Sequence, residues 1–178
     1  MNIFIFKEEP KENAKYLSDV HLRKMIVESC QLLSTAIRDI DKDNNYEYNQ
    51  KILKQLYKPT HNNHPCTKWV KENSANFMWL KEYTIGLLNE FEFRFDKKHK
   101  SQKIISLLNL YGWEYSNIKY SDEKTPFIFV GKDEYKQDKD IFKSYYQYYL
   151  NEKQYNKNGK DIFYFTHRRN PFLVTNKI

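Results

Sequence analysis

The chain has 178 residues, a formal net charge of +7, a pI near 9.1, 17% aromatic residues and four glycines. A chain of this length can bury one core, so we expect a single domain over residues 1–178. There is no run of about 18 apolar residues, and the start MNIFIFKEEPKENAK has acids and Pro10 where a signal peptide needs an apolar stretch. We therefore expect no membrane span and a cytoplasmic location, in the host cell if a phage encodes the protein. The two cysteines, Cys30 and Cys66, are too few for a disulfide framework and suit a reducing compartment.

The positive charge favours polyanionic partners, because each neutralised phosphate releases counterions. The abundance of Lys, Asn, Tyr and Ile also follows from an AT-rich genome, so composition alone leaves both explanations open. The aromatic side chains can stack on bases, although most are expected to fill the core.

The first half of the chain predicts a strand followed by two helices. Residues 2–6 are short, β-branched and aromatic, which is typical of a strand. Ser18 or Asp19 can cap a long helix over residues 19–39, where apolar residues recur at helical spacing. A polar loop then precedes a short helix over residues 50–57, which Pro59 ends.

The second half predicts three further helices and two further strands. A long helix covers residues 74–95, and another covers 103–110, with Gly112 as its left-handed C-cap. Residues 138–155 form a tyrosine-rich helix, and residues 126–130 and 161–165 are strand candidates. The expected fold is therefore a mainly helical single domain, with a possible small β-sheet from the three short runs.

Polar side chains form one stripe on the predicted helix 19–39. Spacings of three, four, three and four residues place them beside the apolar face. A base, an amine and a carboxylate thus lie in a row, which suits catalysis but also describes a lysine–glutamate pair on a solvated face. The stripe consists of His21, Lys24, Glu28, Gln31 and Thr35.

A second polar stripe lies on the predicted helix 74–95 and could face the first across a cleft. Asn76, Tyr83, Glu90 and Arg94 lie within roughly 40° of one another around that helix. Glu90 and Arg94 also have the spacing of a simple ion pair. Cations follow this helix and recur near the C-terminus, where they can hold phosphates. They are Lys97, Lys98, His99, Lys100, Arg168 and Arg169.

The stretch PTHNNHPCTKWV contains two histidines and a cysteine. His61, His64 and Cys66 could supply three zinc ligands only if the loop curled tightly, and no second ligand pair completes the site. We therefore expect no metal and interpret the stretch as a turn shaped by Pro65 and the asparagines Asn62 and Asn63. The histidines could still contact phosphate or shuttle protons. Cys66 is expected to be buried and inert.

Common nucleotide and hydrolase motifs are missing from the sequence. There is no G-x-x-x-x-G-K-[ST], G-x-G-x-x-G or G-x-S-x-G. This disfavours nucleotide and dinucleotide enzymes of the common folds, and we expect no cofactor.

The stretches SDVHLRKMIVESCQLL, YKPTHNNHPCTKWVKENSANFMWL and EFEFRFDKKHKS resemble a family of small proteins found in phages and bacteria, over most of the chain. The shared pattern is H-x-x-K, N-H-P-C-x-x-W and R-x-x-x-x-H-K-S. The order of a helix with H-L and E, an N-H-P loop and a helix with a basic end is similar to the pyrimidine-dimer DNA glycosylases of the phage endonuclease V type.

This resemblance implies that Glu28 performs the acid/base work of base excision. It also implies that an α-amino group at a processed N-terminus attacks the sugar C1′ and forms an imine. The sequence departs from the family at Val27, where the family has a basic residue, and at Asn2, which is too large for ordinary removal of Met1. Lys24 is an alternative amine.

We therefore expect a DNA glycosylase that acts on damaged or modified pyrimidines in DNA, with an accompanying lyase activity left open. Its catalytic candidates are Glu28, His21, Lys24, His64 and Glu90. The alternatives are a phage accessory protein that binds nucleic acid or a phosphorylated small molecule, and a metal-dependent hydrolase. Trp79 or Tyr83 could stack on an extruded base. The candidates for substrate binding are His61, Asn63, Asn76, Tyr83, Arg94, Lys97, His99, Lys100, Arg168 and Arg169.

Overall fold

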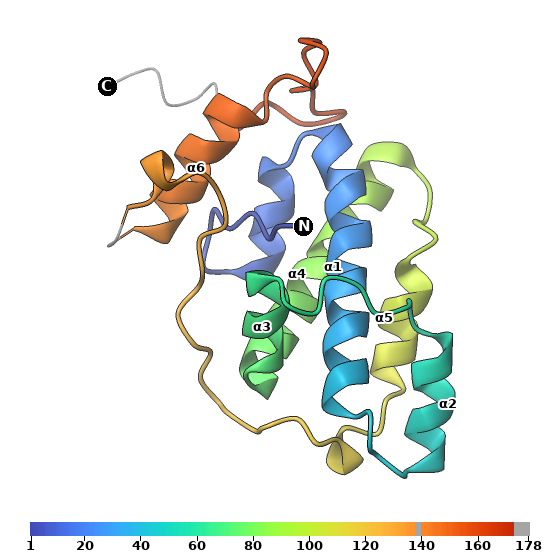
Figure 1. Cartoon of the computed structure of the whole chain (residues 1–178). Helices are drawn as coiled ribbons and strands as arrows, with labels where there is room; N and C mark the ends of the chain where they lie inside the picture. The colour runs from blue at the N-terminus through green and yellow to red at the C-terminus, as the bar shows by residue number, and fades with distance from the viewer. Residues whose placement is uncertain (138–139, 173–178) are drawn as a thin grey trace.

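The computed structural model describes residues 1–137 and 140–172, and helices make up most of its regular structure. Two helices of 22 residues, α1 (Asp19–Ile40) and α4 (Ser74–Phe95), pack against each other at its centre (Figure 1). The predicted mainly helical class is confirmed. In the described part of the chain, no helix is long and apolar enough to cross a membrane.

Shorter elements surround the central pair. The helix α3 packs against both long helices, and α2 and α5 contact each other and α1. The helix α6 lies on the other side of α1 (Figure 1). The shorter elements are η1 (Pro10–Tyr16), α2 (Glu47–Gln55), α3 (Pro65–Lys71), α5 (Gln102–Asn109), η2 (Trp113–Tyr115), η3 (Asp133–Tyr135) and α6 (Ile141–Glu152).

The predicted bounds agree closely for the long helices and less well for the short ones. The bounds of α4 are as predicted, and α1 ends one residue later. The helix predicted at 50–57 begins earlier, at Glu47, and the one predicted at 103–110 is shifted by one residue. The helix predicted at 138–155 covers Ile141–Glu152, and residues 138 and 139 lie outside the described residues. The helix α3 was missed because seven residues are too few to show helical periodicity.

Gly112 does not take the predicted left-handed conformation, since its φ is −77°. Glycine is needed at this position because the backbone lies close to the side chain of Asn49. Its N–H donates to Asn49 Oδ1 at 2.9 Å, and Asn49 Nδ2 donates to its carbonyl at 3.0 Å. A Cβ at Gly112 would lie 3.0 Å from the same Oδ1. The left-handed residue that ends a helix is Asp96, after α4, with φ 48°.

The three predicted strands do not form a sheet within the described residues, so this part of the prediction is wrong. The first run buries four consecutive side chains, from Ile3 to Phe6, rather than alternate ones. Its backbone bonds to side chains: Asn13 Oδ1 accepts from the N–H groups of Phe6 and Lys7 at 2.6 and 2.9 Å. In the second run, the N–H of Val130 donates to a tyrosine hydroxyl at 3.2 Å. The third run forms an isolated bridge between Tyr155 and Asp161 rather than a strand, and the carbonyl of Tyr164 accepts from the N–H of Asp19 at 2.9 Å.

Gly86 allows the N-terminal region to lie directly on α4. A Cβ at this position would lie 2.6 Å from the Cα of Lys11 in η1. Trp79 Nε1 also donates to the carbonyl of Glu8 at 3.0 Å. These contacts lead residues 1–6 past α4 and toward α1.

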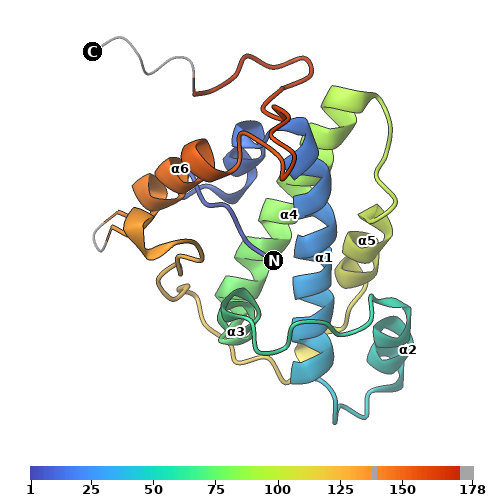
Figure 2. The ribbon, with the colours of Figure 1, turned by 45° about the horizontal axis from the view of Figure 1, so that its top comes forward.

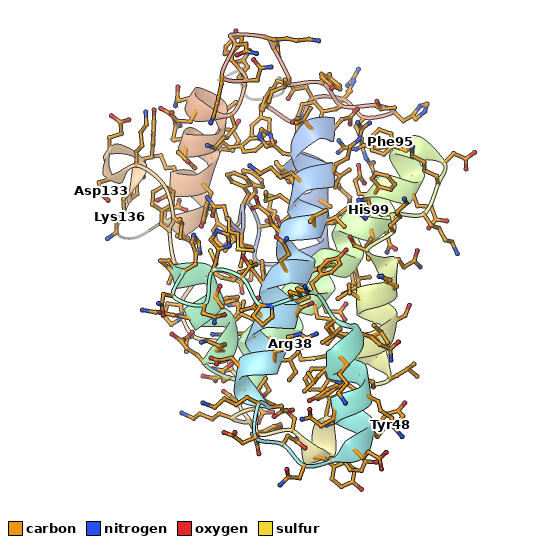
Figure 3. All side chains as sticks on the ribbon, turned by 45° about the vertical axis from the view of Figure 1, so that its right-hand side comes forward. Arg38, Tyr48, Phe95, His99, Asp133 and Lys136 are labelled. Carbon is orange, nitrogen blue, oxygen red and sulfur yellow. The ribbon has the colours of Figure 1, made fainter. Side chains whose placement is uncertain are left out.

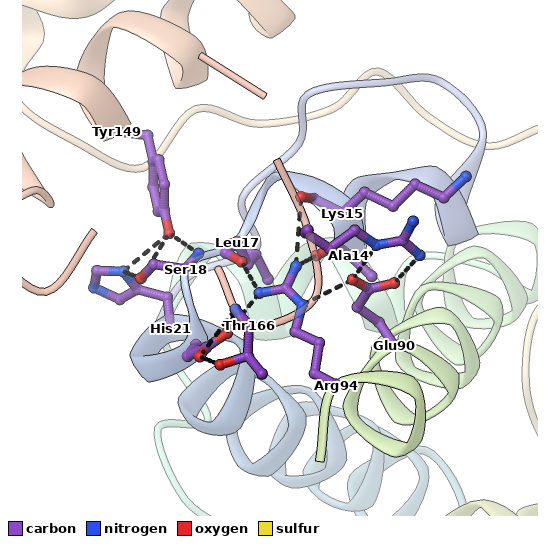
Figure 4. Close-up of polar contacts among 11 residues, drawn as sticks. Ala14, Lys15, Leu17, Ser18, His21, Glu90, Arg94, Tyr149 and Thr166 are labelled. Carbon is purple, nitrogen blue, oxygen red and sulfur yellow. Dashed lines mark hydrogen bonds and ion pairs between the residues drawn. The ribbon is translucent and has the colours of Figure 1, made fainter. Parts of the chain in front are cut away.

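A buried ionic network joins three segments at one end of the long helices (Figure 4). Arg94 on α4 donates to the carbonyl of Leu17 at 2.7 Å, to Asp19 Oδ1 at 2.9 Å and to Glu90 Oε1 at 2.8 Å. Arg168 donates two hydrogen bonds of 2.8 Å to Glu90. Burial alone would raise the pKa of Glu90, but the hydrogen bonds from Arg168 and Arg94 outweigh it and hold this pKa below its ordinary value.

We expect Arg94→Met to destabilise the fold by about 3–5 kcal/mol, because it leaves two buried carboxylates without their shared partner. Urea denaturation measures this loss. Lys15→Met is the matched control, since Lys15 and Glu12 form an exposed ion pair whose removal changes little. A loss below about 1 kcal/mol for Arg94→Met, as is typical of an exposed pair, would contradict the structural role of the network.

Candidate active site

A cavity of about 430 Å³ lies between the beginning of the chain, α1 and the region of α6. Figure 2 shows the N-terminus between α1 and α6. Polar and cationic side chains make up much of its lining. The lining residues are Met1, Asn2, Phe4, His21, Lys24, Met25, Glu28, Val130, Gly131, Lys132, Tyr148 and Lys153.

The carboxylate of Glu28 is held beside the N-terminal segment. The backbone N–H of Asn2 donates to Glu28 Oε2 at 3.0 Å. Lys24 Nζ lies 3.6 Å from Glu28 Oε1, as expected for residues one helical turn apart. The side chain of Glu28 is 13% exposed and that of Lys24 is 63% exposed. The carboxylate thus sits inside the cavity while the lysine extends toward solvent.

The side chain of Asn2 fixes the position of this backbone nitrogen. Its Nδ2 donates to the carbonyl of Val130 at 2.7 Å, and its Oδ1 accepts from the hydroxyl of Tyr145 at 3.1 Å. The cavity is therefore closed by residues far apart in the sequence, and α6 contributes directly to its geometry.

His21 lies on the same face of α1 as Glu28 and is buried. Its Nδ1 is 3.0 Å from both Ser18 Oγ and the Tyr149 hydroxyl (Figure 4). Burial lowers the pKa of His21 to about 4, and the charges of Lys24 and Lys153 act in the same direction. The imidazole is therefore neutral at neutral pH.

The histidine loop enters α3, and His64 is its N-cap. His64 Nδ1 accepts from the N–H of Cys66 at 3.2 Å, and Pro65 occupies the first helical turn. Burial lowers the pKa of His64, followed by the charges of the N-terminal ammonium and His61. His64 is therefore within electrostatic reach of the N-terminal amine. This geometry agrees with the turn-shaping interpretation of the stretch.

The remaining residues of this loop do not assemble a ligand set. Burial raises the pKa of the Cys66 thiol to about 12, so it is protonated at neutral pH. His61 Nδ1 lies 2.6 Å from its neighbour Thr60 Oγ1, and Asn63 is exposed. Among the described residues, no group of three or more His, Cys, Asp or Glu side chains could hold a metal ion.

The predicted stripe on α4 does not line this cavity. Asn76 Nδ2 donates to the carbonyl of Trp69 and to Thr125 Oγ1, each at 2.7 Å, and Tyr83 is fully buried. Glu90 and Arg94 belong to the ionic network. The wall opposite α1 is formed instead by residues 130–132 and 148–153. The expected facing of the two stripes is therefore wrong, because these α4 side chains pack into the interior.

A cationic turn follows α4 on the side of α1 away from α6, where Figure 3 places Phe95 and His99. His99 is half-buried and its Nδ1 accepts from the N–H of Ser101 at 3.1 Å. On α1, the guanidinium of Arg23 lies 4.4 Å from the centre of the Phe95 ring. Arg168 forms an ion pair with Glu90 and is only partly exposed. Exposed cations on or beside this turn are Arg23, Lys97, Lys98 and Lys100, whereas Lys24 lines the cavity and the exposed Arg169 follows Arg168 in the sequence.

Sequence reasoning missed the residues that bring the far part of the chain to the cavity. Asn2, Tyr145 and Tyr149 act through hydrogen bonds, and Lys132 and Lys153 contribute charge. The tyrosine-rich helix was visible in the sequence, but no local pattern identifies the partner of a buried hydroxyl.

A known protein family matches this chain. The model of the pyrimidine dimer DNA glycosylase family matches residues 1–103. No curated protein and no solved structure matches the chain significantly. Because the family match covers more than half of the 178 residues, the chain belongs to the pyrimidine dimer DNA glycosylase family.

Proposed function

We propose that this protein removes damaged pyrimidines from DNA and forms an imine with the sugar, using Glu28 and a primary amine in the cavity between α1 and α6. The observation that carries this proposal is the 3.0 Å hydrogen bond between the N-terminal segment and the Glu28 carboxylate, inside a cavity of about 430 Å³. Membership of the glycosylase family supports DNA as the substrate.

In this reaction the amine attacks C1′ of the damaged nucleotide. The N-glycosidic bond breaks, the pyrimidine leaves with the bonding electrons and takes up a proton, and the sugar opens to an iminium. Glu28 accepts a proton from the attacking amine and stabilises the positive charge that develops on the sugar. Loss of a proton from C2′ of the iminium then breaks the bond from C3′ to its phosphate, which is the lyase step.

The α-amine at the start of the chain fits this role better than Lys24. Asn2 is 9% exposed and its nitrogen already contacts Glu28, whereas the Lys24 side chain reaches into solvent. Trimming of Met1 would turn the Asn2 nitrogen itself into the amine; with Met1 retained, the amine is one residue further along the same cavity.

The cationic surface of α1 and the turn after α4 would hold the DNA backbone. Arg23 and Lys24 lie between the cavity and the turn that carries Lys97, Lys98 and Lys100, so the exposed cations flank both sides of α1. Trp79 and Tyr83 are too deeply buried to stack on an extruded base. Tyr148 is the aromatic residue of α6 that lines the cavity and would take that place.

We expect Glu28→Gln to slow strand cleavage of ultraviolet-irradiated duplex DNA by about 10²–10⁴-fold, because the amide cannot accept the proton of the amine. DNA binding should persist, since a carboxylate does not hold phosphates. End-labelled duplexes with dimers, with an abasic site and without damage separate the glycosylase step from the lyase step. Binding to all three duplexes without cleavage by the unmodified protein would instead favour a purely nucleic-acid-binding function.

We expect borohydride to trap the protein on irradiated DNA through the N-terminal peptide. Mass spectrometry of the trapped adduct identifies the amine, and the mass of the intact protein shows whether Met1 is retained. Lys24→Arg is the matched control, because it keeps the cation but cannot form the imine. Trapping that maps to Lys24, or that disappears in this variant, would contradict assignment to the α-amine.

Binding should weaken with salt along a negative slope of log Kobs against log salt. We expect replacement of Lys97, Lys98 and Lys100 by glutamine to make this slope less steep, by about 0.9 for each phosphate that is no longer neutralised. Fluorescence anisotropy with an undamaged duplex at several salt concentrations measures that slope. The control replaces Lys51, Lys54 and Lys58, which are exposed on and after α2. Equal slopes for the two triple variants would remove the basic turn from the DNA-binding surface.

A further inference from the structure

We infer that His21 presents a neutral Nε2–H donor to the cavity and that Tyr149, assisted by Ser18, is the positioning residue that sets this tautomer. This inference rests on the proposed function for its catalytic consequence. Its structural part concerns only the side chains on α1 and α6. Two buried hydroxyl groups contact the Nδ1 edge of the imidazole, and His21 also lines the cavity.

Hydrogen-bond counting around Tyr149 favours one tautomer of His21. The Tyr149 oxygen accepts from the backbone N–H of Ser18 at 2.9 Å. Its own proton can go to His21 Nδ1 at 3.0 Å or to Ser18 Oγ at 3.5 Å. If Nδ1 carried a proton, the tyrosine would keep only the longer, weaker contact. A bare Nδ1 accepts the tyrosine proton, so the ring proton lies on Nε2.

The other ring nitrogen is free to meet a substrate. Figure 4 shows the ring with Nδ1 turned toward Tyr149 and Ser18, and no hydrogen bond of Nε2 is found within the described residues. The ring packs edge-on against Phe4, 6.0 Å between centroids, and against Tyr149, 5.2 Å. His21 lines the same cavity as Glu28.

The charges around His21 favour a neutral ring. Lys24 projects from α1, and Lys132 and Lys153 line the cavity from the opposite wall. Glu28 is the carboxylate that faces them, and it is already paired with Lys24 and with the N–H of Asn2. Burial, Lys24 and Lys153 together lower the pKa of His21 to about 4. An imidazolium is therefore not the working form near neutral pH.

A neutral N–H donor suits the departure of a pyrimidine base. Negative charge develops on the carbonyl oxygen of the base as the glycosidic bond breaks, and a fixed donor stabilises that charge more in the transition state than in the ground state. The other tautomer would direct a lone pair at this oxygen and repel it. The position of one proton on the imidazole thus decides whether His21 assists or opposes base departure.

Nitrogen NMR of the ¹⁵N-histidine-labelled full chain tests the tautomer without any activity assay. We expect His21 to carry its proton on Nε2 at pH 7 and to remain neutral down to about pH 4. In Tyr149→Phe, which keeps the ring packing but loses the hydroxyl, the fraction with a proton on Nδ1 should rise. Tyr111→Phe is the matched control, because Tyr111 is also buried and its hydroxyl binds Asp41, remote from this cavity. A wild-type ring that carries its proton on Nδ1, or that is charged at pH 7, would overturn the inference.

Single-turnover excision tests the catalytic consequence. We expect Tyr149→Phe to slow cleavage of the N-glycosidic bond by about tenfold with little change in DNA affinity, and Tyr111→Phe to leave both unchanged. His21→Gln places an amide N–H near the Nε2 position and should retain more activity than His21→Asn, whose amide lies near Nδ1. This pair decides the question even if Tyr149→Phe fails to fold.

The outcomes separate this inference from the proposed function. If the wild-type protein excises the base but His21→Asn is as active as His21→Gln, the donor role fails and the glycosylase proposal stands. If the wild-type protein breaks no N-glycosidic bond in any damaged duplex, the glycosylase proposal and the catalytic role of His21 fail together. The NMR result then still decides the tautomer.

Discussion

The side chains of Asn13 and Asn2 supply the hydrogen bonds that a neighbouring strand would otherwise make with the first residues of the chain. The segment from Ile3 to Phe6 buries every side chain, so its backbone N–H and C=O groups also leave water and need partners. Asn13 Oδ1 accepts from the N–H groups of Phe6 and the following Lys7, Asn2 Oδ1 accepts from the N–H of Ile3, and the amide nitrogen of Asn13 donates to the carbonyl of Lys7. Because the partners are side chains rather than a strand, the segment can cross α4 and end beside Glu28. The active-site geometry depends on this arrangement.

The buried ionic network makes a second contribution to the site. It pairs the charges of Arg94 and Arg168 with carboxylates, so that these charges add little to the potential at the site. Arg94 and Arg168 are balanced by Glu90 and Asp19, so these four ionisable groups, of which only Arg168 is partly exposed, add no net charge. The lysines around Glu28 and on the turn after α4 then determine the potential of the outer surface. In the proposed function, this cationic surface attracts DNA, and the mostly buried Glu28 carboxylate stabilises the positive charge that develops on the sugar.

The sequence predicted the parts of this molecule that depend on local periodicity. The two long helices were correct nearly to the residue, because each carries an apolar face over six turns, and the row of His21, Lys24 and Glu28 follows from spacing within α1. The sheet was wrong because an apolar run of five residues looks the same whether a strand or an asparagine side chain satisfies its backbone. The facing of the two stripes was wrong because spacing gives the relative angle of residues on one helix but not how that helix is rotated against another. Glu90 and Arg94 turned inward, where their i, i+4 ion pair is completed by Asp19.

The boundary of the family match divides the cavity lining into a part within the match and a part beyond it. Residues 1–103 supply Glu28, His21 and the N-terminal segment, which are the groups that act on the sugar and its glycosidic bond in the proposed reaction. The opposite wall comes from residues 130–153, beyond the match, and it reaches the catalytic side through Tyr145 and Tyr149. A base that enters the cavity must fit against this wall, while the attack at C1′ takes place at the other. If the proposed reaction takes place here, the chemistry and the choice of base belong to separate stretches of sequence, and the tyrosine hydroxyls of α6 join the wall to His21 and Asn2.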